Sequence, residues 1–300
     1  MSESDGERIA LNVGRARLEI CPDQGGVVTE FSWNVDGSKY DWLRPAPQAR
    51  SFAPTDAASF PLLPISNRVR NGHYVFQGRE YRMPLNFAPE RHAIHGHGWQ
   101  TSWTLEETTD HSLEISFDHA GEDWPAPYRG VQRYTLSEED LSIEMIVRNL
   151  GERPMPAGLG PHPYFIRTPQ ARLTALVEKM WTSDDEVMPV DLVDLPAGRR
   201  IVDGILPSQL AMDGVFTGFG GRAEIVWPEW NAGMTMEADP AQQFLVVYTP
   251  AGEDFFCAEP VTNCTDALTM LAEGKADTGL VTLAPGESFA VTTRFTPHLG

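Results

Sequence analysis

The sequence predicts an all-β protein, and within that class a large antiparallel β-sandwich. Apolar and polar residues alternate over many short segments. The chain contains 26 glycines and 24 prolines, which supply many tight connections. No amphipathic pattern of helical period continues for more than about two turns. These three observations favour short strands joined by turns over helices.

The first expected elements lie in the N-terminal third of the chain. Pro45 to Pro64 is rich in proline and alanine and is expected to form an ordered loop or arm over the sheet. Asn71-Gly72 then precedes an aromatic segment, HYVF, which is expected to be a strand. Gln77-Gly78 follows and predicts a hairpin turn before REYRM.

Strict alternation predicts three half-buried strands further along the chain, at 112–117, 141–148 and 287–295. In the second of these, Leu141, Ile143, Met145 and Val147 fall on one face. Turn residues at Asn149-Leu150-Gly151 and Pro285-Gly286 separate the strands from their neighbours.

Length and composition favour a globular protein with a single domain over residues 1–300, because a chain of 300 residues can bury a large core. No apolar run approaches the roughly 20 residues that span a bilayer, so no membrane association is expected. The start of the chain lacks the pattern of a secretory signal. Cys21, Cys257 and Cys264 form no CxxC pair. We therefore expect a cytoplasmic protein with free, buried thiols.

The charge balance narrows the class of partner. A formal net charge of −19, from 42 acidic and 23 basic residues, would repel nucleic acid and anionic lipid, so a neutral small molecule is the easier partner. There is no P-loop and no HExxH motif, and the GxG at 158–160 runs into Pro161 and Pro163 instead of opening a helix. No nucleotide or other cofactor is expected.

Two residues have a setting that favours acid-base chemistry. His162 lies between Pro161 and Pro163, which stiffen the backbone and present the imidazole in a defined direction. Glu259 follows the apolar run FFCA, and a carboxylate that emerges from a buried strand is either paired or functional. The alternative for His162 is an ordinary core or surface histidine.

The histidines of RHAIHGHGW allow two interpretations. His92, His95 and His97 lie within six positions, which invites a metal site of the cupin HxH type. Such a site would need a glutamate three or four residues later, where this chain has Thr101 and Ser102. No metal is therefore expected.

Several other side chains could bind an oxygen-rich ligand. Arg68, which follows Asn67, offers a planar fork of donors, although a surface ion pair would explain it equally well. Asp213 could accept hydrogen bonds, but Asp-Gly is also a plain turn signal. Trp124 and Tyr128 could stack on the C–H face of a sugar or pack in the core.

Four short motifs together resemble the aldose 1-epimerase (mutarotase) family. They are Asn67-Arg68, His95-Gly96, GLGPHPYF at 158–165 and FFCAEPVTNCTDAL at 255–268, and the resemblance runs from about residue 10 to residue 296. It implies the galactose mutarotase-like supersandwich and a cofactor-free enzyme that interconverts the α and β anomers of a free aldose. Asn263 departs from the pattern, because relatives often carry histidine there.

The resemblance also implies roles for individual residues. Glu259 is expected to be the catalytic base and His162 the general acid that protonates the ring oxygen. His95, Arg68 with Asn67, and Asp213 are expected to hydrogen-bond the sugar. The segment 123–130 resembles a loop that closes over the sugar, which assigns Trp124 or Tyr128 to stacking.

Alternatives remain open at this point. A mutarotase of sugar 6-phosphates would need a basic pocket, for which Arg70, Arg91 and Arg129 are candidates. A sugar-binding protein without activity could keep the same fold. Monomer and homodimer are both possible. If the enzyme works at neutral pH, a neighbouring carboxylate such as Glu259 should raise the pKa of His162.

Overall fold

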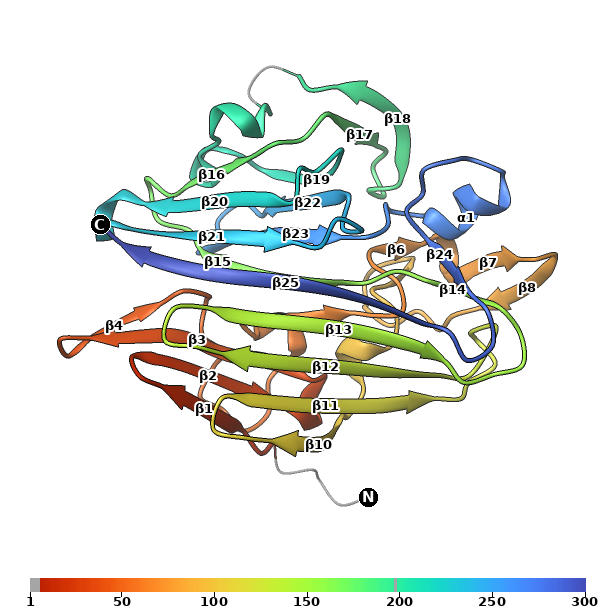
Figure 1. Ribbon diagram of the computed structural model, residues 1–300. Helices are drawn as coiled ribbons and strands as arrows, with labels where there is room; N and C mark the ends of the chain where they lie inside the picture. Colours follow the sequence, from red (N-terminus) through yellow and green to blue (C-terminus); the bar gives the residue numbers. More distant parts are fainter. Residues whose placement is uncertain (1–5, 197–198) are drawn as a thin grey trace.

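The computed structural model describes residues 6–196 and 199–300 of the chain (Figure 1). The described part is built mainly of antiparallel strands in two large sheets, whose apolar faces meet in a common core. This architecture confirms the predicted all-β sandwich.

The larger sheet carries the strands that matter most for the site. Its eleven strands are β1 (Ile9–Val13), β2 (Ala16–Cys21), β3 (Val27–Val35), β4 (Ser38–Asp41), β5 (Ser59–Leu62), β15 (Gly160–Ile166), β17 (Lys179–Ser183), β18 (Pro189–Asp194), β19 (Met212–Thr217), β22 (Phe244–Thr249) and β23 (Phe255–Val261). Their order is β1-β2-β3-β5-β15-β23-β22-β19-β17-β18, with β4 paired to β3.

The second large sheet covers the first. Its eight strands are β10 (Thr104–Thr108), β11 (Ser112–His119), β12 (Tyr128–Leu136), β13 (Leu141–Asn149), β16 (Arg172–Ala175), β20 (Arg222–Trp227), β21 (Ala232–Ala238) and β25 (Ser288–Leu299). They lie in the order β10-β11-β12-β13-β25-β21-β20-β16, and the long β25 runs through the middle of the sheet (Figure 1).

Short elements complete the described chain. Three small sheets pair β6 (Arg68–Val69) with β9 (Ala93–Ile94), β7 (His73–Phe76) with β8 (Arg79–Arg82), and β14 (Met155–Ala157) with β24 (Val281–Leu283). The helices are α1 (Ala267–Ala272) and the 3-10 turns η1 (Pro22–Gln24), η2 (Pro54–Asp56), η3 (Arg70–Gly72), η4 (Gly98–Gln100), η5 (Ile201–Asp203), η6 (Pro207–Gln209) and η7 (Pro228–Trp230).

The strands predicted from alternation are confirmed. They correspond to β11, β13 and β25, and the four predicted apolar positions of β13 are all buried. The predicted hairpin is also present, because Gln77 and Gly78 join β7 and β8 with φ angles of 48° and 76°. Two consecutive left-handed residues give a turn that matches the twist of the two strands.

The core lies between the two large sheets. Leu18 and Phe31 from the larger sheet belong to the same buried cluster as Tyr134 and Ile143 from the smaller sheet. Burial of one such aliphatic side chain is worth about 1.5–3 kcal/mol, so the packed faces hold the sheets at a fixed distance. Part of the other face of the larger sheet, which points away from this core, does not pack against the second sheet.

The expectation of a loop from Pro45 to Pro64 is wrong for its last part. Residues 59–62 form β5, which pairs with β15 in the larger sheet. Pro61 lies opposite Pro161 in this pair, and neither residue has an N–H to donate. Proline disfavours strands, so the sequence did not predict one here. The two prolines are tolerated in the pair because they lie opposite each other.

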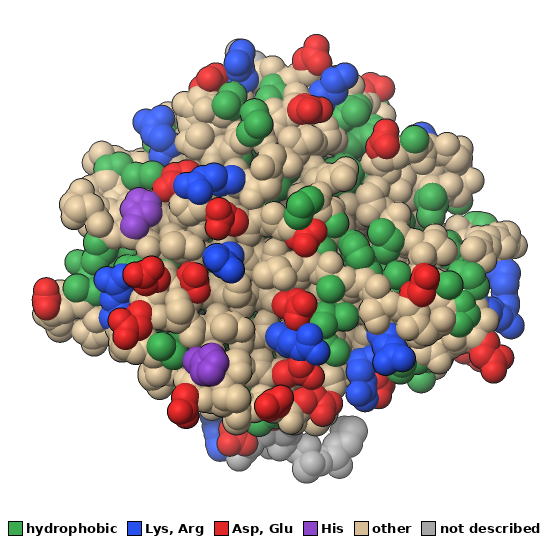
Figure 2. Space-filling model, in the orientation of Figure 1, with side chains coloured by type: hydrophobic (Ala, Val, Ile, Leu, Met, Phe, Trp, Pro, Cys, Tyr) green, Lys and Arg blue, Asp and Glu red, His purple; other side chains and the backbone are tan. Residues whose placement is uncertain are grey.

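The three cysteines are free and buried, as expected. On the face seen in Figure 2, acidic and basic side chains are interspersed over the surface. In the part of the chain that the structure describes, no helix is both long and apolar enough to cross a membrane.

Candidate active site

A cavity of about 420 Å³ lies over the middle strands of the larger sheet. Among the residues that line it are six of the eight predicted site residues, namely Asn67, Arg68, His95, His162, Asp213 and Glu259. This volume falls within the usual range of small-molecule sites. Residues that are up to 192 positions apart, from 67 to 259, therefore share one pocket.

Strand register explains why these residues meet. His162 lies opposite Phe60 in the pairing of β15 with β5, and Glu259 lies opposite Val246 in the pairing of β23 with β22. The pairing of β15 with β23 matches Tyr164 to Cys257, and the same register continued by two residues brings His162 beside Glu259. Because side chains alternate between faces, all of these point to one side of the sheet.

His162 and Glu259 form the central pair of the cavity. Nε2 of His162 lies 3.3 Å from Oε1 of Glu259, and the side chains are only 8% and 2% exposed. Oε2 of Glu259 has no hydrogen-bond partner among the described residues. A buried carboxyl oxygen in this position is available to a hydroxyl group of a ligand. Phe60 stacks on the imidazole, with ring centroids 4.2 Å apart.

The expected upward shift of the His162 pKa is wrong for this structure. Burial lowers the pKa of His162 to about 3, and the nearby Arg44 cation acts in the same direction. Burial also raises the pKa of Glu259 well above its ordinary value, with a further contribution from Asp213. Desolvation disfavours both charged forms, which favours a neutral imidazole beside a protonated carboxyl group. In this neutral form the pair holds one transferable proton.

His95 is held in one tautomer by its neighbour. The backbone N–H of Asn67 donates to the ring atom Nδ1 of His95 at 3.1 Å. The backbone N–H of His95 donates in turn to the backbone carbonyl of Asn67 at 3.0 Å. Burial, together with His162 and Arg68, lowers the pKa of His95 well below its ordinary value. The ring is therefore neutral, with its proton on Nε2. His95 is equipped to donate a hydrogen bond into the cavity.

Arg68 is fixed between two carboxylates. It donates to Glu90 from Nε at 3.3 Å and from Nη2 at 3.2 Å, and to Asp213 from Nη1 at 3.3 Å. The side chain amide oxygen of Asn67 accepts from the Arg68 backbone N–H at 2.8 Å. Burial raises the pKa of Asp213, although Arg68 opposes this effect. These residues form a polar wall of donors and acceptors beside the central pair.

Trp124 and Tyr128 do not lie at the cavity, which corrects the expectation that one of them stacks on a sugar. Both are buried in the main core, where Trp124 contacts Tyr74 with ring centroids 5.5 Å apart. The Tyr128 hydroxyl lies 2.7 Å from Nδ1 of His97. Both rings pack in the core instead of lining the cavity.

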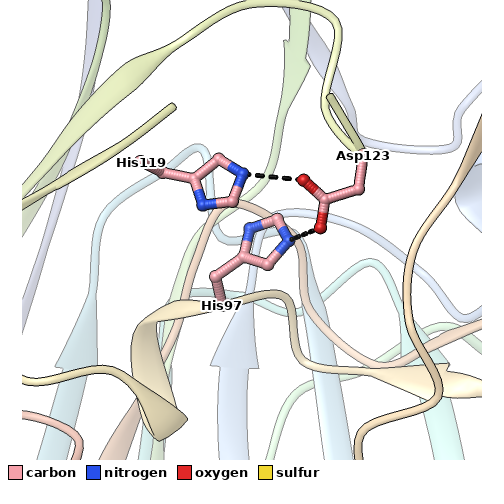
Figure 3. A group of neighbouring side chains, drawn as sticks. All are labelled: His97, His119 and Asp123. Carbon is pink, nitrogen blue, oxygen red and sulfur yellow. Dashed lines mark hydrogen bonds and ion pairs between the residues drawn. The ribbon is translucent and has the colours of Figure 1, made fainter. Parts of the chain in front are cut away.

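A second polar group connects this loop to the segment after His95 (Figure 3). Asp123 accepts from Nε2 of His97 at 3.1 Å and from Nε2 of His119 at 2.9 Å. The two imidazoles stack with centroids 4.0 Å apart and planes 11° apart. The Nε2 atoms of both rings are directed at the same carboxylate, whose two oxygens accept one hydrogen bond each. The group therefore forms a hydrogen-bonded clamp, and its three ligand atoms lie within 4.8 Å of one another, close enough to share a metal ion.

The three histidines near position 95 do not form a common ligand set. His95 faces the cavity, and His97 belongs to the clamp with Asp123. Nδ1 of His92 accepts from the backbone N–H of Asn71 at 3.1 Å. Each imidazole therefore has its own partner.

The basic residues considered for a phosphate pocket point elsewhere. Arg70 pairs with Asp266 at 2.9 Å, Arg91 with Glu186 at 3.0 Å and Arg129 with Asp118 at 2.7 Å. None of the three arginines lines the cavity. They are neutralised by surface or loop carboxylates.

Asn263 has a structural role in this fold. Its side chain accepts from the Ser66 N–H at 3.1 Å and donates to the Ser66 carbonyl at 3.0 Å. It is fully buried and does not line the cavity. The residue that departs from the family pattern therefore fixes the segment just before Asn67 without contacting a ligand there.

Sequence reasoning missed several residues of the cavity wall, among them Arg44, Phe60, Glu90, Trp99 and Tyr248. The sequence around each of these residues contains no motif that distinguishes it from an ordinary core or surface residue. The guanidinium of Arg44 lies over the Tyr164 ring at 4.2 Å, and its Nη2 donates to the Thr55 carbonyl at 2.7 Å. Phe60 lies inside Pro45 to Pro64, the segment that was expected to form a loop. Strand register brings Phe60 and Tyr248 to the site, whereas Arg44, Glu90 and Trp99 reach it from the segments that connect the strands.

Comparison with known proteins adds the family. A family model described as aldose 1-epimerase matches residues 7–296. The uncharacterized protein YphB of Escherichia coli K12 is 33% identical over 287 residues, which cover 93% of this chain and 94% of that protein. A galactose mutarotase of Mus musculus is 26% identical over 139 residues, or 45% of this chain and 39% of the mouse protein.

A solved structure also resembles the whole chain. The crystal structure of a candidate aldose 1-epimerase from Escherichia coli K12 matches with a TM-score of 0.88 and 28% identity. The match covers 98% of this chain and 99% of that one. The two proteins therefore share one fold from end to end.

Proposed function

The chain belongs to the aldose 1-epimerase family, and from this premise we propose that it interconverts the α and β anomers of a free aldose by opening and reclosing the sugar ring. The observation that carries the proposal is the buried pair of His162 and Glu259, 3.3 Å apart in a cavity of sugar size. A cavity that only bound sugar would not need a transferable proton at its centre.

The proposed reaction moves two protons and no other group. Glu259, as the carboxylate, takes the proton of the anomeric hydroxyl, and His162, as the imidazolium, gives a proton to the ring oxygen. The C1–O5 bond breaks, rotation about C1–C2 turns the aldehyde, and reclosure from the other face inverts C1. Reversal of both transfers restores the pair. Each positioned acid or base typically accelerates such a step by ~10²–10⁴-fold.

The resting pair contains the same number of protons as this reactive arrangement. The neutral and ionised forms differ only by transfer of one proton across the 3.3 Å contact. Sugar hydroxyls that donate to the carboxylate, together with the Arg68 cation, favour the ionised form. We propose that binding of the sugar shifts the proton from Glu259 to His162. The ionised pair, with His162 as the acid and Glu259 as the base, therefore forms only when the sugar is bound.

The remaining polar groups orient the sugar. His95 donates from Nε2, and the wall of Arg68, Glu90 and Asp213 offers both donors and acceptors to hydroxyl groups. Phe60 and Trp99, whose ring centroids are 5.3 Å apart, present an apolar surface that suits the C–H face of a pyranose. These contacts hold C1 and O5 at the pair.

The charge of the lining favours a neutral sugar over a phosphorylated one. The carboxyl side chains at the cavity are Asp56, Glu90, Asp213, Glu253 and Glu259, and the arginines are Arg44 and Arg68. A phosphate group carries about −1.5 to −2 charges near neutral pH and would meet this excess of carboxyl groups. The sugar 6-phosphate mutarotase is thus the weaker alternative.

The wider setting of the enzyme is part of the proposal. Free, buried thiols suit a reducing compartment, so we propose the cytoplasm, and a single domain as monomer or homodimer. The net charge of −19 argues against nucleic acid as a partner.

The test is the rate of anomer exchange, measured by polarimetry or NMR on freshly dissolved α-anomers of glucose, galactose, xylose, arabinose and fucose, and of glucose 6-phosphate. We expect acceleration with at least one neutral aldose. In Glu259→Gln the rate should fall at least ~10²-fold while the protein stays folded, because the amide cannot accept the proton. Glu253→Gln, which changes another carboxyl at the cavity, should leave the rate nearly unchanged.

Each other outcome identifies an alternative. Acceleration of glucose 6-phosphate alone would make the protein a sugar phosphate mutarotase. Binding of sugars without acceleration would make it a sugar-binding protein. Full activity in Glu259→Gln would remove this residue from the mechanism.

A further inference from the structure

Cys257 is a buried nucleophile at the catalytic pair that the proposed reaction does not use. It lies on β23 two residues before Glu259, so both side chains point to the same face. Its cross-strand partners are Tyr164 and Tyr248, which line the cavity, as does Glu259. Cys257 itself is fully buried among these residues. The thiol is thus directly beneath the cavity floor.

Three different ligand types come together at this point. His162, Cys257 and Glu259 each offer one ligand atom, and these atoms lie within 4.8 Å of one another. Nitrogen, sulfur and oxygen from such side chains are the usual ligands of Zn²⁺. In a tetrahedral site with ligand bonds of about 2.0–2.1 Å, nitrogen and oxygen ligands are about 3.3 Å apart. The observed distance from Nε2 to Oε1 is 3.3 Å.

Charge balance also favours a divalent ion here. The surroundings disfavour a single buried charge, but Zn²⁺ with one thiolate and one carboxylate is neutral overall. The unpartnered Oε2 of Glu259 shows that the carboxyl group has spare capacity to bind. On binding, the thiol and the carboxyl group each release one proton, and the imidazole ligates in its neutral form.

We propose that Zn²⁺ binds to His162, Cys257 and Glu259 and inhibits the enzyme. The fourth position opens into the cavity, where a water molecule completes the tetrahedron. Coordination removes both the proton acceptor and the proton donor of the catalytic pair. The ion is therefore an inhibitor and takes no part in turnover. The His97, His119 and Asp123 clamp also has three ligand atoms within 4.8 Å of one another, but it contains no thiol, so a thiolate signal distinguishes the two groups.

The test uses Co²⁺ as a spectroscopic substitute for Zn²⁺, since a thiolate ligand gives an intense charge-transfer band in the near ultraviolet. Wild type, Cys257→Ala and Cys264→Ala are each titrated with cobalt chloride. Cys264 is a matched control, because it is another buried thiol, with its Sγ 3.7 Å from Sδ of Met270. The band should saturate at one Co²⁺ per chain in wild type and Cys264→Ala, and be absent in Cys257→Ala.

The same variants are then compared for bound Zn²⁺ and its effect on anomer exchange. Cys257→Ala should keep the exchange rate but lose affinity for Zn²⁺ by more than the about 10–100-fold that loss of an outer-shell partner causes. EDTA should restore the inhibited wild type. Metal binding is measured without sugar, so this result stands even if the proposed reaction fails.

Two results would overturn the inference. One is the lack of a thiolate band in wild type at saturating Co²⁺. The other is a band, or a Zn²⁺ affinity, that is unchanged in Cys257→Ala. If Cys257→Ala does not fold, Glu259→Gln serves instead, because an amide is a poor ligand and should weaken Zn²⁺ binding while the thiolate band of any bound Co²⁺ persists.

Discussion

Hydrogen bonds fix what single residues at the cavity can do. Asn67 and His95 both have left-handed backbones, with φ of 65° and 62°, and they are joined by two hydrogen bonds. Non-glycine residues adopt this region with some strain, which the surrounding structure must hold. In return, the His95 proton is confined to Nε2, where it faces the cavity. The strained backbone thus keeps the His95 ring in position as a hydrogen-bond donor.

Arg68 shows how a planar group organises its neighbours, and it leads to a first prediction. Arg68→Lys should raise KM for the sugar by about ten- to a hundredfold with little change in kcat. A lysine cannot bridge Glu90 and Asp213 with a planar fork, and each hydrogen bond to a charged group is worth about 1.5–3 kcal/mol. The measurement is steady-state anomer exchange across sugar concentrations.

A neighbouring arginine supplies the control for this prediction. Arg70→Lys changes the same type of residue on the adjoining turn, where it pairs with Asp266 and does not line the cavity. Its KM should stay within about twofold of wild type. A fall in kcat at unchanged KM in Arg68→Lys would mean that Arg68 acts on the transition state and not on binding.

At the scale of elements, periodicity and motif information were complementary. β13 was predictable because one of its faces is buried and the other is partly exposed. β15 and β23, which carry His162 and Glu259, are buried almost throughout and show no alternation. Their importance was predictable only from their motifs. The direction in which Trp124 points could not be predicted, since an aromatic side chain suits a core and a sugar equally.

The clamp around Asp123 joins the segment after β9 to the end of β11 and the loop that follows it, and it gives a second prediction. Asp123→Ala should lower the free energy of unfolding by about 1.5–3 kcal/mol, because both imidazoles lose a charged acceptor. Burial raises the pKa of Asp123, but the bonds from His119 and His97 outweigh it and hold this pKa well below its usual range. Urea unfolding at pH 7.5 measures the loss.

The adjacent Glu122 gives a matched control for the clamp. It is exposed, and Glu122→Ala should change the stability by no more than about 0.5 kcal/mol. Equal effects of the two substitutions would show that Asp123 contributes only its surface charge. A wild-type stability in Asp123→Ala would mean that water replaces both hydrogen bonds.

For the whole molecule, the sequence predicted the sandwich, and it predicted which groups line the cavity better than it predicted their protonation. Composition and alternation were sufficient for the fold class, and the order of the motifs was sufficient to select His162 and Glu259. Burial could not be read from the motifs, so the direction of the His162 pKa was predicted wrongly. Desolvation depends on what every other strand places around the ring, including Phe60 from an unpredicted strand.

That burial leads to a prediction for the stability of the protein, which should decrease as the pH falls from 6.5 to 4.5. His95, His97 and His162 all have a pKa lowered by burial from the ordinary value of 6.5. In this window the unfolded chain therefore takes up protons on these imidazoles more readily than the folded protein does. Glu259 and Asp213, whose pKa values burial raises, act in the opposite direction.

Each proton that one state binds and the other does not changes the slope by about 1.36 kcal/mol per pH unit, and the three histidines outnumber the two carboxyl groups that oppose them. Urea unfolding at pH 7.5, 6.5, 5.5 and 4.5 gives this slope directly. His162→Asn removes one of the three imidazoles and should flatten the slope by up to about 1.4 kcal/mol per pH unit. A stability that is constant or rises on acidification would mean that these histidines accept protons inside the fold, and the neutral state of the catalytic pair would have to be abandoned with them.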